Sequence, residues 1–220
     1  MSLCGGIKKH GLTDIRFITP SALSYGASDE NPCLEKVEHL LSSVRKILGN
    51  KGRIFFGTFP SEVRPEHISP QSLKIFKKYV NNNNLVIGGQ SGSDRILKKC
   101  HRGHNAESII RAARYCREEG YIPNVDFILG FPEETEEDVS KTIRLIDNLV
   151  YYGARIHLHY FIPLPGSPYG NKIPASIGDI TRKKIEKLIS AGSVYGQWKQ
   201  QEDFVKEYAT EYLNGNYGES

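Results

Sequence analysis

A carboxylate inside an apolar run is the first residue in this sequence that could do chemistry. Residues 125–130 read Val-Asp-Phe-Ile-Leu-Gly, and Asp126 is the only charged side chain among them. A charge within a buried strand is costly unless it meets a polar partner or a cavity. Asp126 is therefore a candidate ligand-binding residue, and the alternative is a position on a partly hydrated edge strand.

Two histidines form a second candidate group. His157 and His159 alternate with apolar residues in the run 155–162, so they share one face of a strand. Two imidazoles can bind a metal ion, but the neighbouring sequence offers no third ligand. The spacing favours side chains that line a substrate cavity, or plain packing.

Strands and helices that would position these residues alternate along the chain. Apolar or alternating runs predict strands at 14–18, 53–56, 85–88, 125–130 and 155–162. Helical patterns follow at 32–49, 69–80, 93–100, 105–120 and 135–150, and a further helical stretch covers 181–213 with a break near Gly192. Thr135 and Asp138 have the spacing of a capping box. This order predicts an α/β fold with parallel strands and right-handed crossovers, either barrel-like or doubly wound.

In both architectures ligands bind beyond the carboxyl ends of the strands. Those ends carry Thr19, Glu62, Gln90, Asp126 and Pro163. Five polar or proline-rich segments should therefore meet on one face and form a site. The alternative is that loops after strands are polar in any protein.

Composition excludes several classes of protein. The chain has 220 residues, of which 39% are hydrophobic and 25% charged, as in ordinary globular domains. Its net charge of +4 is spread among many acids and bases, so it does not by itself indicate nucleic-acid binding. No apolar run approaches the roughly 20 residues that span a bilayer, and no signal peptide is evident. We expect a cytoplasmic protein without a membrane partner, whose four separated cysteines are reduced.

Two segments together resemble the radical S-adenosylmethionine superfamily. They are residues 89–104, Gly-Gln-Ser-Gly-Ser-Asp to Arg-Gly-His, and residues 126–135, Asp-Phe-Ile-Leu-Gly-Phe-Pro-Glu-Glu-Thr. The proline-rich loop 163–168 and the segment 61–66 strengthen the resemblance, which covers residues 14–170. It is greatest to the branch of methylthiotransferases and oxygen-independent coproporphyrinogen dehydrogenases, and to archaeal proteins that also carry a cobalamin-binding domain.

The resemblance implies a fold and a cofactor. The fold is a partial TIM-like (β/α)6 radical SAM barrel over residues 1–178, without its first β/α unit, followed by a C-terminal helical extension over residues 179–220. The cofactor is S-adenosylmethionine. Glu62 would contact it, Gln90 would lie beside the ribose and Arg102 near the methionyl carboxylate. Asp126 would bind the ribose hydroxyls, and Ile128 would pack against the adenine.

Further positions follow from the same resemblance. Thr19, Pro20 and Ser21 occupy the place of a Gly-Gly-Glu segment that binds the amino group of the cofactor in many members, although these residue types differ here. Four residues would line the substrate cavity: Arg64, Ser91, His157 and His159.

The superfamily motif Cys-x-x-x-Cys-x-x-Cys, which holds a [4Fe-4S] cluster, occurs nowhere in this sequence. We therefore expect a C-terminal fragment that performs no radical chemistry alone. The intact protein would cleave S-adenosylmethionine at the cluster to give a 5′-deoxyadenosyl radical. Its substrate would be a small molecule or RNA, with methyl or methylthio transfer as the outcome, and a missing N-terminal domain would bind cobalamin.

Two other readings remain open. The chain would be a natural barrel without a cluster that acts as a binding or scaffold module, or a protein that binds RNA without catalysis. In either case a barrel that lacks one strand exposes unpaired backbone groups at its edge. We expect a homodimer, or aggregation, through that edge.

Overall fold

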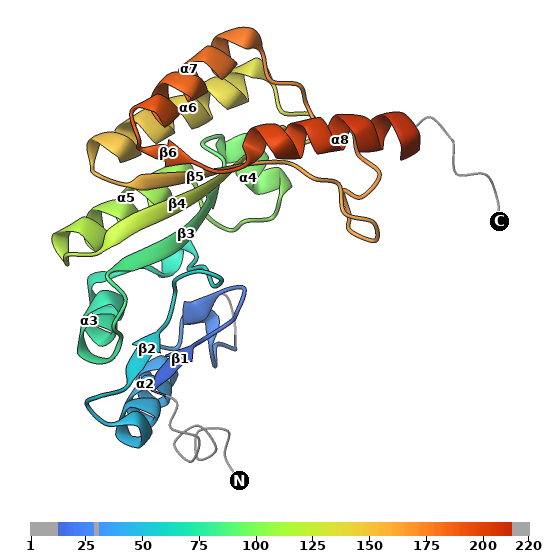
Figure 1. The fold of residues 1–220 in the computed structure, drawn as a ribbon. Helices are drawn as coiled ribbons and strands as arrows, with labels where there is room; N and C mark the ends of the chain where they lie inside the picture. The colour runs from blue at the N-terminus through green and yellow to red at the C-terminus, as the bar shows by residue number, and fades with distance from the viewer. Residues whose placement is uncertain (1–12, 29–30, 213–220) are drawn as a thin grey trace. The chain divides into compact units, whose positions relative to one another are not determined.

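The computed structural model describes residues 13–28 and 31–212; Cys4 lies outside this range. Strand β1 (Asp14–Arg16) pairs in parallel with β2 (Arg53–Phe55). A second sheet has the strand order β3 (Asn84–Gln90), β4 (Ile122–Leu129), β5 (Arg155–Tyr160) and β6 (Val194–Tyr195), with β5 and β6 parallel. The predicted α/β fold with parallel strands and intervening helices is confirmed (Figure 1).

The chain divides into two compact units. The first comprises residues up to Gly88 together with Glu107–Asn124, and the second comprises Gly89–Ala106 and the residues from Val125 onward. Strands β3 and β4 therefore contribute residues to both units. Each unit is described below by itself.

In the first unit, helices α2 (Leu34–Leu48) and α3 (Pro70–Tyr79) pack together, and short 3₁₀ helices lie at Ala22–Ser24 and Pro65–His67. A capping box starts α3, since the Ser69 hydroxyl accepts from the amide of Ser72 and the Ser72 hydroxyl accepts from the amide of Ser69. Helix α5 (Ala106–Glu118) buries a face that includes Ile109, Ala113 and Cys116, as its spacing predicts.

The second unit holds helices α4 (Asp94–Lys99), α6 (Glu136–Tyr151), α7 (Asp179–Ser190) and α8 (Trp198–Tyr212). Figure 1 shows α6 and α7 side by side over β5 and β6, in agreement with the contacts of α6 with β5 and of α7 with β6. The residues of β5 that face the core, including Ile156 and Leu158, are fully buried. The helices therefore cover one face of these strands.

Strand β6 is the main element that the sequence did not predict. Two residues, Val194 and Tyr195, show no periodicity, and they become a strand only because β5 supplies a parallel partner. Residues 179–212 are otherwise largely helical, and the expected domain boundary at residue 178 stays a prediction. None of the helices in the described part of the chain has the length and hydrophobicity needed to cross a membrane.

Candidate functional site

Strand β4 presents Asp126 on a partly exposed face. Asp126 and Ile128 are half-buried, whereas Phe127 and Leu129 between and beyond them are fully buried. This alternation puts Asp126 and Ile128 on the same side of the strand. Because β4 lies between β3 and β5, the alternative of an edge strand is wrong. The Asp126 carboxylate has a polar neighbour, because its Oδ1 lies 3.4 Å from Nδ1 of His157.

Strand β5 presents its two histidines in the same way. His157 and His159 are half-buried, and the residues that alternate with them are buried. Nε2 of His159 lies 3.1 Å from Nδ1 of His157, and the ring of Tyr195 stacks on His157 at a centroid distance of 4.8 Å. Burial lowers the pKa of His157, and burial together with the nearby His157 lowers the pKa of His159 to about 4. Both imidazoles are therefore neutral at physiological pH.

The turn after β4 contains a buried acid that sequence reasoning missed. Gly130 has a φ of 77°, a left-handed conformation that favours glycine, and its amide donates a 2.7 Å hydrogen bond to Glu134 Oε2. Glu134 is 8% exposed, and this burial raises its pKa to about 7 against the effect of the backbone donors. The sequence showed Glu134 only as an acid beside the start of a helix. Acids at such positions are usually exposed to solvent, so the pattern did not indicate a buried side chain.

Three of the predicted residues lie between the end of β3 and the segment after α4. Gln90 is buried and has a φ of 68°, so the chain turns sharply there. Ser91 is fully buried; its hydroxyl accepts from the amide of Ser93 and lies 3.3 Å from the Thr142 hydroxyl. Its hydroxyl is therefore engaged inside the protein. Arg102 is half-buried just beyond α4, where its amide donates to the carbonyl of Leu97.

A second network fixes α4 and α6 in place. Asp138, which is 2% exposed, accepts hydrogen bonds from the hydroxyl of Ser93, the guanidinium of Arg95, and both the hydroxyl and the amide of Thr135. Burial alone would raise the pKa of Asp138, but these donors outweigh it and hold the pKa below its usual range. The sequence predicted the capping box of Thr135 and Asp138. It did not predict that Asp138 also accepts hydrogen bonds from Ser93 and Arg95.

In the first unit, Glu62 lies against β3. A side chain at Gly88 would bring its Cβ within 2.7 Å of Glu62 Oε2, so it would displace this carboxylate from its observed position. Two residues further on, Arg64 Nε donates to Glu66 Oε1 at 2.6 Å. Glu66 is therefore an ion-pair partner of Arg64.

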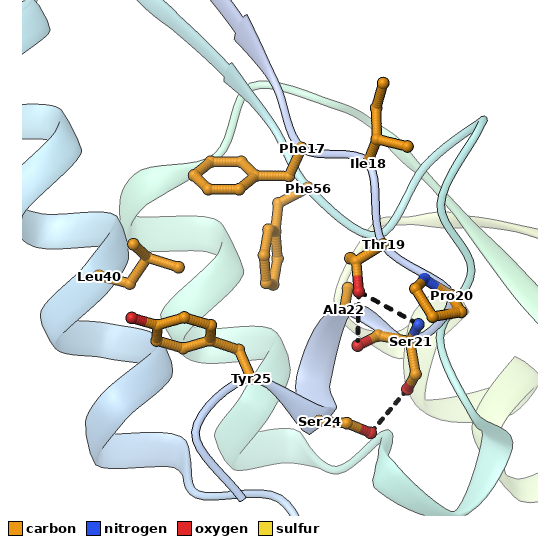
Figure 2. A pocket seen from close by; sticks show the side chains of 10 residues that line it. All are labelled: Phe17, Ile18, Thr19, Pro20, Ser21, Ala22, Ser24, Tyr25, Leu40 and Phe56. Atoms are coloured by element: carbon orange, nitrogen blue, oxygen red, sulfur yellow. Dashed lines mark hydrogen bonds between the residues drawn. The ribbon is translucent and has the colours of Figure 1, made fainter. Parts of the chain in front are cut away.

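The loop after β1 borders a cavity of about 350 Å³. Thr19, Pro20 and Ser21 lie along it, and Figure 2 shows the ring of Tyr25 on another side. The amide of Thr19 donates to the hydroxyl of Ser61 at 3.0 Å, which ties this loop to the loop after β2. The remaining lining is mostly apolar: Phe17, Ile18, Ala22, Ser24, Leu40 and Phe56.

The predicted residues therefore fall into two groups. Thr19–Ser21, Glu62 and Arg64 belong to the first unit, and the second unit holds the others. Within the second unit the structure brings together Asp126, His157 and His159. Tyr195 joins them through a strand that the sequence did not predict.

The cysteines do not fit an iron–sulfur cluster. The three that the structure describes are free thiols, with Cys33 and Cys100 half-buried and Cys116 in the core. Burial raises the pKa of Cys116 to about 12 and also raises that of Cys100, whereas a cluster ligand must be a thiolate. No three cysteines in the sequence have the required spacing, so no reaction step is assigned to a cluster here.

The chain thus has an α/β fold with parallel strands, and β4 presents an acid and an apolar residue on one face before a turn that begins at Gly130. The chain matches the radical SAM superfamily over residues 16–146, which is more than half of its length. It belongs to this superfamily. Members use S-adenosylmethionine and a [4Fe-4S] cluster.

Among curated relatives, the chain is 38% identical over 187 residues to a tRNA-2-methylthio-N(6)-dimethylallyladenosine synthase from Ehrlichia canis. This alignment covers 81% of the chain and 40% of the relative. A synthase of the same name from Clostridium tetani is 31% identical over 205 residues, with 90% and 43% covered. The chain thus spans about two fifths of the length of these relatives.

Solved structures show the same fold. Coproporphyrinogen III oxidase from Escherichia coli, a radical SAM enzyme, superposes with a TM-score of 0.60 at 19% identity, over 82% of this chain and 41% of that one. A radical S-adenosylmethionine methyltransferase from Kitasatospora setae, solved with cobalamin and a [4Fe-4S] cluster, gives a TM-score of 0.57 at 16% identity, with 75% and 31% covered.

Proposed function

We propose that this chain is the S-adenosylmethionine-binding part of an enzyme that modifies RNA by methylthio transfer. The observation that carries the proposal is the placement of Asp126 and Ile128 side by side on the partly exposed face of β4, within the region that matches the superfamily. Both curated relatives described above are named as tRNA-2-methylthio-N(6)-dimethylallyladenosine synthases, which supports RNA as the substrate class. The cofactor, once bound and reduced, supplies radical chemistry.

The residues of the second unit would hold the nucleoside part of the cofactor. The Asp126 carboxylate accepts from both ribose hydroxyls, because an ionised acid offers acceptors and no donors. Ile128 gives the adenine an apolar contact, and Gly130 keeps the end of the strand free of a further side chain. Gln90 adds an amide beside the ribose, and the Arg102 guanidinium pairs with the methionyl carboxylate.

The family resemblance also assigns roles to residues of the first unit, each considered within that unit. Glu62 would offer a carboxylate to S-adenosylmethionine. Thr19, Pro20 and Ser21 line a cavity and occupy the place of the segment that binds the amino group of the cofactor in many members. Arg64 would face the substrate, where a guanidinium suits the phosphates of RNA.

Isothermal titration of the chain with S-adenosylmethionine tests this proposal. Asp126→Asn should weaken binding about 10- to 100-fold, since hydrogen bonds to a charged group contribute roughly 1.5–3 kcal/mol. Asp147→Asn is the matched control, because Asp147 is an exposed acid on α6 outside the site. Equal affinity in the wild type and Asp126→Asn, or no binding at millimolar cofactor, would refute the proposal.

A second function is favoured by the cysteine spacing, which supplies no cluster ligands. The chain would then be a binding module for RNA without catalysis. Filter binding of a tRNA at increasing salt distinguishes this case, since phosphate contacts release counterions and give a steep salt slope. Affinity that does not change with salt argues against RNA binding. We expect either protein in the cytoplasm.

A further inference from the structure

The three side chains that the structure brings together on β4 and β5 have the donor set of a metal site. Asp126 offers a carboxylate oxygen, and His157 and His159 each offer an imidazole nitrogen. These ligand atoms all lie within 4.8 Å of one another. The sequence showed only the two histidines; the third ligand comes from a neighbouring strand, about 30 residues earlier in the chain.

The distances fit a transition-metal ion. Nδ1 of His157 lies 3.1 Å from Nε2 of His159 and 3.4 Å from Oδ1 of Asp126. Ligand atoms about 2.1 Å from an ion are about 3.0 Å apart at an octahedral edge and about 3.4 Å apart at a tetrahedral edge. Nδ1 of His157 therefore lies at ligand spacing from an atom of each of the other two residues, and the ligand atoms of all three residues lie within 4.8 Å of one another.

The chemistry of the surroundings supports coordination. Two imidazole rings and a carboxylate from adjacent strands converge on one point, with their ligand atoms within 4.8 Å of one another. His157 is held by stacking on Tyr195, at an angle of 10° between the rings, so its orientation is fixed before an ion binds. The side chains of His157 and Asp126 are 28% and 19% exposed, which leaves the site accessible from solvent.

We propose that Asp126, His157 and His159 bind one divalent transition-metal ion of the zinc and iron(II) class. Two imidazoles and one carboxylate suit these ions better than magnesium or calcium, which prefer oxygen ligands alone. Three protein ligands leave coordination positions open for water or substrate, as in catalytic rather than structural sites. The ion and the ribose of S-adenosylmethionine would compete for Asp126.

The test is titration of tag-free, EDTA-treated chain with Co²⁺ alone, without S-adenosylmethionine. We expect visible d–d absorption that saturates at one equivalent and is removed by one equivalent of Zn²⁺. His157→Ala and His159→Ala should each weaken binding at least 100-fold, because a ligand to the ion contributes more than the surrounding residues do. His39→Ala, at an exposed histidine on α2, should leave affinity unchanged.

Three results would overturn the proposal. They are the absence of d–d bands, equal affinity in the wild type and both histidine variants, and a strong thiolate-to-cobalt charge-transfer band, which would place the ion on a cysteine. Circular dichroism and the fluorescence of the buried Trp198 verify that each variant is folded. If an alanine variant is unfolded, His159→Gln is measured in its place and should also lose binding. Since no cofactor is present, failure of S-adenosylmethionine binding does not affect this result.

Discussion

Replacing the buried Asp138 with alanine should destabilise the second unit more than replacing any of its exposed acids. The Asp138 carboxylate joins the loop after β3, through Ser93, to α4, through Arg95, and to the cap of α6, through Thr135. Alanine removes every one of these acceptors. The neighbouring Glu137 is the matched control, because it is exposed and pairs only across one helical turn with Lys141.

The loss of stability in Asp138→Ala can be worked out from the donors that lose their acceptor. The hydroxyl of Ser93 is fully buried, and a buried donor without a partner costs about 1–3 kcal/mol. The amide of Thr135 loses its acceptor, which is one of the two hydrogen bonds of the capping box. Loss of such a helix cap costs about 1 kcal/mol. Arg95 is 45% exposed, so water replaces much of its ion pair and this pair adds little. Asp138→Ala should therefore cost about 3 kcal/mol. Glu137→Ala should cost far less, because Glu137 is exposed.

Urea unfolding followed by tryptophan fluorescence measures this difference. Trp198 is the single tryptophan, is 3% exposed and belongs to the second unit, so its signal reports that unit. A loss of about 3 kcal/mol lowers the urea midpoint by about 1.5–2 M. The pKa of Asp138 is held low in the folded state, so this stabilisation is present above about pH 4 and disappears on acidification. Equal midpoints for Asp138→Ala and Glu137→Ala would refute the reasoning.

Three further changes have expected outcomes. The pKa of Glu134 is raised to about 7, so wild-type stability should fall by about 3 kcal/mol from pH 4.5 to 7 relative to Glu134→Gln; parallel pH profiles would contradict this. Gly92→Ala should destabilise by about 1–3 kcal/mol in urea, because its Cβ would lie 2.5 Å from the Cα of Thr142; an unchanged midpoint would show that the backbone adjusts freely. Ser69→Ala should cost about 1 kcal/mol by circular dichroism through loss of the α3 cap, whereas the exposed Gln71→Ala should cost little, and equal effects would disprove the role of the cap.

The expected homodimer rests on strand edges. Among the described residues, β1 pairs with β2 and with no other strand. An edge of this kind offers unpaired amides and carbonyls to another chain. Sedimentation at increasing concentration tests the expectation, and a monomer throughout would contradict it.

Local signals were read correctly from the sequence. Strands β1 to β5 appear at the predicted apolar or alternating runs, and α6 starts with the capping box of Thr135 and Asp138. These features depend on residues within a few positions of one another, which the sequence displays directly. The motifs at residues 89–104 and 126–135 likewise indicated the superfamily that the comparison confirms.

Long-range features could not be read in this way. Strand β6 needs a partner from β5, and Tyr195 reaches His157 only through that pairing. The buried state of Ser91 depends on Thr142, about 50 residues later, and the raised pKa of Glu134 depends on how deeply its turn is buried. Each depends on burial or pairing that a local pattern does not encode.

Local patterns indicated strands β1 to β5, the helices between them, the superfamily and the two histidines on one strand face. The position of Asp126 beside these histidines, where it completes the proposed set of metal ligands, follows from the tertiary fold. Hydrogen bonding between neighbouring strands sets the register that places β4 next to β5. Register sets which side chains on adjacent strands meet, and no spacing within either strand alone reveals it.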